Sequence, residues 1–157
     1  MAASHLPNFR LADGEDSGAT KYLVKAGAAT SVKTGDFVLQ NTAGDVHYAK
    51  AIGTGNASTD DVVIGLAATN STETVSVDGS VMVYDDSDNK YIGLAEVKAN
   101  LADAKLLTKV IILSNATTGI QTLDEDDVTK GIARILDYNA TSGEVTFRIS
   151  QAVQLSN

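Results

Sequence analysis

The chain has 157 residues, with 12 basic and 20 acidic side chains, a formal net charge of −8 and no cysteine. This length predicts one domain with a sizeable core, and the absence of cysteine excludes disulfides and thiolate chemistry. The charge argues against nucleic acid and anionic membranes as partners, because phosphate groups are bound mainly by Lys and Arg and the sequence has no basic cluster.

The composition predicts an all-β protein. Thirteen Gly, a single Pro and short apolar runs between turn residues indicate many strands, and the expected fold is a compact β-barrel or β-sandwich with one short helix. The first twenty residues lack helical and strand periodicity, so we expect an extended N-terminal arm over 1–20 and a single β-rich domain over 21–157. No signal peptide or membrane-spanning run is recognised, which predicts a soluble protein that is not exported.

Strands are predicted in the first half of the domain at 21–25, 37–40, 46–52 and 62–66. The next stretch, 72–84, contains four valines of one parity, at positions 75, 77, 81 and 83. A two-residue turn at Asp78-Gly79 would place the two valine pairs on opposite faces. We therefore expect one continuous strand, kinked at Gly79, with all four valines buried; a three-residue loop is the alternative.

The second half contains the one predicted helix. Leu94, Val97, Leu101 and Ala104 recur at helical spacing, which predicts a helix near 96–107. A strand at 110–113 and an acidic connection at 122–130 follow. The last element is a predicted hairpin of 131–138 and 144–150, although Val128, Ile132 and Ile135 also permit a helix in place of its first strand.

Two acidic clusters are the candidate metal sites. Asp85, Asp86, Asp88 and Asn89 offer hard oxygen ligands, but they lack the Gly and Glu of a calcium loop, so a solvated hairpin turn is the favoured interpretation. The run 124–127 (DEDD) is interpreted as a solvated loop or a helix start, with a metal site as the weaker alternative. We expect no metal and no cofactor.

Catalytic arrangements are poorly supported. A triad would need Asp16 and Ser17 with His5 or His47, but Asp16 and Ser17 fall in the arm, and His47 is predicted to face solvent from a strand. The glycines at 53–55 lack the third glycine of a dinucleotide fingerprint and predict a surface loop. We expect that the protein is not an enzyme.

Three stretches carry a family resemblance: TGDFVLQNTAGDVHYA, VVIGLAA and VSVDGSVMV, all within 34–83. They combine a Gly-Asp before a strand, a hairpin, an apolar Ile-Gly-Leu-Ala and a valine-rich strand interrupted by Gly. In these features the segment resembles the small head-decoration, or cement, proteins of tailed bacteriophages. The resemblance implies a compact β-barrel or β-sandwich that binds between capsomers on an assembled shell.

The function implied by the resemblance is mechanical. It is that of a structural virion protein that binds the outer surface of a phage capsid, stabilises contacts between capsomers and is made in the bacterial host cytoplasm. The implied partners are the major capsid protein and further copies of the chain, as a homotrimer. In the arm, Leu6, Phe9 and Leu11 would be apolar anchors and Arg10 would pair with an acidic capsid group; a disordered tail is the alternative.

Two other classes of function stay open. One is a receptor- or carbohydrate-binding β module of a phage fibre or bacterial surface adhesin, although sugar binding usually uses exposed aromatic side chains and the chain has few. The other is an enzyme, for which the sequence offers no convergent set of titratable groups.

Overall fold

The computed structural model describes residues 9–15, 18–27, 31–43, 46–51, 55–57, 62–114, 120–128 and 131–150. These residues form two antiparallel sheets, which confirms the all-β prediction. The first sheet has the strand order β1-β8-β12-β11-β9-β10, with β5 also paired to β9. Its strands are β1 (Phe9–Leu11), β5 (Gly55–Ala57), β8 (Lys90–Leu94), β9 (Lys109–Ser114), β10 (Gln121–Asp124), β11 (Ala133–Tyr138) and β12 (Glu144–Ile149).

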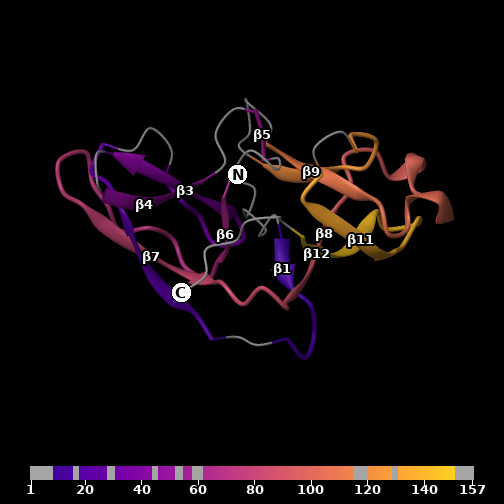
Figure 1. Cartoon of the computed structure of the whole chain (residues 1–157), viewed down its shortest axis with the longest axis horizontal. Coiled ribbons are helices and arrows are strands. Elements are labelled where there is room, and N and C mark those ends of the chain that lie inside the picture. Colours follow the sequence, from indigo (N-terminus) through magenta and orange to yellow (C-terminus); the bar gives the residue numbers. More distant parts are fainter. Residues whose placement is uncertain are drawn as a thin grey trace, which may run out of the picture.

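The second sheet has the order β2-β7-β6-β3-β4. Its strands are β2 (Thr20–Val24), β3 (Phe37–Ala43), β4 (Val46–Ala51), β6 (Val63–Ala67) and β7 (Gly79–Tyr84). Figure 1 shows the two sheets as two lobes side by side along the long axis of the molecule. The first sheet curls back on itself, because a parallel bridge joins Ala95, just after β8, to Leu123 in β10.

Strands β3 and β6 are buried on both faces. Successive side chains of a strand point to opposite faces, and in β3 Phe37 and Leu39 join one core while Val38 joins another. All five residues of β6 are buried, and the neighbours Leu66 and Ala67 lie in the first and the second core, respectively. The apolar run that begins at residue 62 therefore separates two cores.

The first core lies between the two sheets and is centred on aromatic rings. Phe9, Phe37, Tyr91 and Phe147 pack with ring centroids 4.9–5.9 Å apart, several of them edge to face, which is a favoured geometry for aromatic pairs. These residues include every Phe of the chain. The second core is aliphatic and belongs to the second sheet: Val24, Val32, Val38, Ala49, Ala51, Ile64, Ala67, Val81 and Val83.

The continuous strand predicted over 72–84 is wrong for its first half. Strand β7 begins only at Gly79, so Val81 and Val83 are buried, whereas Val75 and Val77 are 90% and 61% exposed. The reason is Gly79, since a Cβ there would overlap the backbone of Glu73. The missing side chain lets the chain fold back closely on itself, rather than kink within one strand.

The helix predicted over 96–107 is also wrong. Two short 3₁₀ helices, Lys98–Asn100 and Asp103–Lys105, occupy the segment, and the residues that flank each of them are extended. Of the four residues with helical spacing, only Leu101 lies in a hydrophobic core; Leu94 and Val97 are about half exposed. The spacing does not mark a buried helical face.

The C-terminal hairpin is confirmed. Strands β11 and β12 pair antiparallel, with a bulge between Ile135 and Asp137, and Val145, Phe147 and Ile149 all point into the first core. The alternative of a helix over 131–138 is therefore wrong. No helix among the described residues is long and apolar enough to cross a bilayer.

Candidate functional site

The predicted partner-binding residues of the arm lie largely in the chain's own fold. Phe9 is 1% exposed in the first core and β1 pairs with β8, so residues 9–11 of the predicted extended arm belong to the first sheet. Leu11 packs against the same core. Arg10, which was predicted to pair with an acidic capsid group, forms an ion pair of 3.1 Å with Glu144 of the same chain. Leu6 lies outside the described residues.

The acidic turn 85–89 connects the two sheets, so the hairpin interpretation is wrong: β7 belongs to the second sheet and β8 to the first. Asp85 accepts hydrogen bonds from the hydroxyls of Thr20 (3.1 Å) and Tyr22 (2.6 Å). Burial and the Asp85 carboxylate raise the pKa of Tyr22. Asn89 is buried. The turn thus fastens β2 to the junction between the sheets.

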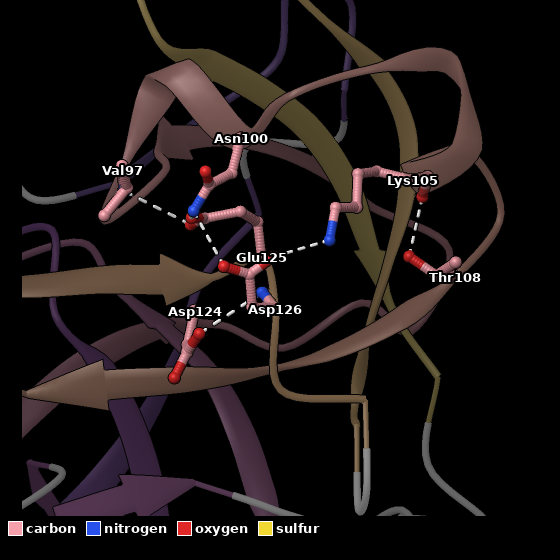
Figure 2. A network of polar contacts seen from close by, with 7 residues as sticks. All are labelled: Val97, Asn100, Lys105, Thr108, Asp124, Glu125 and Asp126. Atoms are coloured by element: carbon pink, nitrogen blue, oxygen red, sulfur yellow. Dashed lines mark hydrogen bonds and ion pairs between the residues drawn. The ribbon is translucent and has the colours of Figure 1, made fainter.

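The second acidic cluster, at the end of β10, is a bracing network and not a solvated loop (Figure 2). Glu125 is 1% exposed, and its two carboxylate oxygens accept from the Val97 N–H (3.3 Å) and the Asn100 side chain (3.0 Å). Asp126 binds Lys105 at 2.6 Å and also accepts from Asn100. These bonds hold the two 3₁₀ helices in place.

The bracing network keeps an excess of negative charge. We define the acidic cluster as Glu96, Asp124, Glu125 and Asp126; in the part of the chain that the structure describes, its one ion pair joins Asp126 to Lys105. Burial and the three neighbouring carboxylates raise the pKa of Glu96. Among the described residues, no group of three or more His, Asp or Glu side chains is arranged to hold a metal ion.

Four basic residues meet in a row across the first sheet, which corrects the statement that the chain has no basic cluster. Cross-strand neighbours pair Lys90 with Arg148, Arg148 with Arg134, and Arg134 with Lys109. Residues directly opposite each other share a face, and the flanking residues of each strand are buried, so this basic row lies on the outer face. Each residue comes from a different strand, and the four are far apart in the sequence, so they form no cluster in the sequence itself.

Among the described residues the most exposed large apolar side chain, Val75 (90%), belongs to the loop between β6 and β7, as does Val77 (61%); Leu107 (66%) is exposed outside this loop. We call Val75 and Val77 the valine tip. The loop is closely braced: the Thr74 N–H donates to the Val77 carbonyl at 2.9 Å, and the Thr72 N–H donates to the Ser80 carbonyl at 3.0 Å. The Gly27 N–H donates to the Thr74 carbonyl, which ties the tip to the loop after β2. The two valines are therefore presented on a fixed backbone.

Charged groups fasten the base of the valine tip. Asp78 accepts a hydrogen bond of 2.7 Å from the Ala26 N–H and lies 3.5 Å from the Lys25 ammonium. The Ala26 hydrogen bond, helped by Lys25, lowers the pKa of Asp78. A pocket of about 520 Å³ adjoins this point, lined by Lys21, Tyr22, Leu23, Asp78, Gly79 and Ser80.

The residues considered for a catalytic triad are not assembled by the described structure. His5, Asp16 and Ser17 lie outside the described residues, and His47 is described only by its place in β4. Gly55 begins β5, which pairs with β9, so the predicted surface loop at 53–55 is wrong at its last residue. Comparison of the chain with protein-family models, curated proteins and solved structures found no match.

Proposed function

We propose that the chain is a structural decoration protein that binds the outer surface of a phage capsid and stabilises contacts between capsomers. The observation that carries the proposal is the valine tip, two apolar side chains exposed on a braced loop. An exposed apolar side chain contributes little to the stability of its own fold, and it is suited to a contact with another molecule. The partners in this proposal are the major capsid protein and other copies of the chain, as homotrimers on the capsid exterior.

Two further features support the proposal. The segment 34–83, which carries the resemblance to decoration proteins, contributes β3, β4, β6 and β7, four of the five strands of the second sheet. The valine tip lies within that same segment. The burial of β3 and β6 on both faces makes this sheet a rigid support, which suits a protein that resists separation of its neighbours.

The size of the effect follows from burial. Full burial of one Val side chain contributes roughly 1.5–3 kcal/mol, so two valines per copy supply a modest contact. A shell carries many copies whose contacts act together, so a modest contact by each copy is sufficient to stabilise the shell.

The test uses undecorated capsid shells of a phage whose genome encodes this chain. We expect the wild-type chain to co-sediment with the shells and to raise the temperature at which they come apart. The variant Val75→Ser/Val77→Ser should fold normally and lose at least tenfold in affinity. The matched control is Val128→Ser, which changes a valine of similar exposure (56%) outside the loop.

The result has clear alternatives. Equal binding by the wild type and the valine-tip variant would show that the tip is not the contact. Failure of the wild type to bind any shell, together with binding to host cell-surface glycans or receptors, would favour the receptor-binding module.

A further inference from the structure

The chain contains two Asp-Gly pairs, Asp13-Gly14 and Asp78-Gly79. In such a pair the backbone nitrogen of Gly can attack the side-chain carboxyl carbon of the preceding Asp. Gly makes this attack easier, because it has no Cβ to shield the nitrogen and its backbone rotates more freely than that of other residues. The attack also requires that the pair can move, and in this respect the two pairs differ.

The first pair lies in a loosely closed turn. It follows β1 in the link that runs from the first sheet to the second (Figure 1). One hydrogen bond closes the turn, from the Glu15 N–H to the Ala12 carbonyl at 3.3 Å, which is long for an N–H···O bond. Asp13 and Gly14 are both exposed. In the part of the chain that the structure describes, no ion pair holds the Asp13 carboxylate.

The second pair is held at both of its residues. Asp78 accepts a hydrogen bond of 2.7 Å from the Ala26 N–H and pairs with the Lys25 ammonium at 3.5 Å. Gly79 is the first residue of β7, which pairs with β2 from this position onward, and a Cβ at Gly79 would overlap the backbone of Glu73. Rotation of the peptide unit between Asp78 and Gly79 would disrupt these contacts.

We propose that Asp13-Gly14 is a site of spontaneous isoaspartate formation and that the fold protects Asp78-Gly79 from the same reaction. The Gly14 nitrogen forms a bond to the Asp13 Cγ, the nitrogen loses its proton and the carboxyl loses its hydroxyl. One water therefore leaves, and a succinimide ring remains. Water then opens the ring. Attack at Cγ restores aspartate, whereas attack at the Asp13 backbone carbonyl breaks its bond to the Gly14 nitrogen and leaves isoaspartate, in which the main chain runs through Cβ and Cγ.

The protonation state of the carboxyl group adds to the protection of Asp78. A neutral carboxyl can release water during ring closure, whereas a carboxylate has a much poorer leaving group. The Ala26 hydrogen bond and Lys25 lower the pKa of Asp78. At a given pH, Asp78 is therefore in the reactive neutral form less often than an aspartate without such partners.

The modification would change the link between the sheets and leave the sheets themselves intact. Isoaspartate lengthens the main chain at residue 13 by one atom, so the hydrogen bond between Glu15 and Ala12 would no longer close the same turn. Residue 13 belongs to neither core. The reaction needs no partner molecule, and it is independent of the proposed capsid contact.

The experiment stores the purified chain for several weeks at neutral pH and physiological temperature, and peptide mapping by mass spectrometry then locates isoaspartate. In the folded chain we expect at least tenfold more isoaspartate at residue 13 than at residue 78. A second sample is stored in concentrated guanidinium chloride, which unfolds the chain. There the two pairs should react at similar rates, because the contacts that protect Asp78 are lost.

The matched variant is Gly14→Asn. Gly14 has a φ of +84°, and Asn tolerates a positive φ better than most residues do. A Cβ at residue 14 meets no atom of the rest of the described chain within 4 Å, so the turn should persist while the nitrogen becomes shielded. Isoaspartate at residue 13 should fall at least tenfold, with an unchanged circular dichroism spectrum.

Two results would overturn the proposal. One is equal isoaspartate at residues 13 and 78 in the folded chain. The other is an equally strong preference for residue 13 in the unfolded chain, since the fold would then not decide which pair reacts.

Discussion

Gly93 lies directly beneath an aromatic ring. In the pairing of β1 with β8 it is the register partner of Phe9, and a Cβ at this position would overlap the Phe9 ring. We predict that Gly93→Ala lowers the free energy of unfolding by about 1–3 kcal/mol, the usual cost of overpacking a core. Urea denaturation measures this difference.

The same contact provides its own control. Phe9→Leu removes the ring that an added Cβ would meet, so Gly93→Ala should cost less in a Phe9→Leu background than in the wild type. Equal costs in both backgrounds would mean that the ring does not limit residue 93.

Asp78 gives the valine tip a dependence on pH. The Ala26 N–H and Lys25 lower the pKa of this carboxyl in the folded chain below its value in the unfolded chain. A lowered carboxyl pKa contributes stability above the unfolded pKa of about 3.9, and the contribution is lost as the pH falls through the folded pKa. We predict that Asp78→Asn destabilises the protein at pH 7 and that the difference shrinks in acid. Urea denaturation of both proteins from neutral pH to about pH 3 checks this; a constant difference would contradict it.

At the scale of elements, Gln121 joins the two sheets. It is 1% exposed in β10, and its Oε1 accepts from the backbone N–H of Phe37 in β3 at 2.7 Å. We predict that Gln121→Leu costs about 1–3 kcal/mol in unfolding free energy, because the buried Phe37 N–H loses its acceptor. Thr122→Val, a half-buried neighbour, is the control in thermal and urea denaturation and should change stability little. A Gln121→Leu protein as stable as the wild type would contradict this role.

Strands were predictable from the sequence where only one face of the strand is buried. Val145, Phe147 and Ile149 alternate with half-buried residues, and β12 follows that pattern. The same reasoning failed at 72–84, because parity cannot reveal that Gly79 allows the backbone to approach Glu73. It failed at 96–107 because Glu125, 28 positions from Val97 in the sequence, accepts a hydrogen bond from the Val97 N–H and so holds an irregular turn there.

The candidate surfaces depend on contacts between distant residues, which is why the sequence did not predict them. The basic row exists only through the register of four strands. Phe9 lies in a segment whose composition is typical of an arm. Its burial depends on the missing side chain of Gly93, which is far along the chain and leaves room for the Phe9 ring. The acidic run 124–127 was recognised as a cluster, but its buried Glu125 was not, since the sequence does not show where Asn100 lies.

At the scale of the whole molecule, the two cores share strands and should unfold together. β3 and β6 contribute side chains to both. We predict one calorimetric transition with equal calorimetric and van't Hoff enthalpies. Phe147→Ala in the first core should cost about 3–5 kcal/mol and Val81→Ala in the second about 0.5–3 kcal/mol, each shifting the same transition. Two transitions, each moved by one variant, would contradict this.

Burial of β3 on both sides limits how the gene for this chain can change in length. Loss of the codon for Val38 would leave Phe37 and Leu39 as neighbours that point to opposite faces, so one of the two would turn toward the wrong core. A codon gained at 75 or 76 would only enlarge an exposed bend. Foreign peptides should therefore be tolerated by the fold at that bend, but they would displace the valine tip and with it the proposed capsid contact.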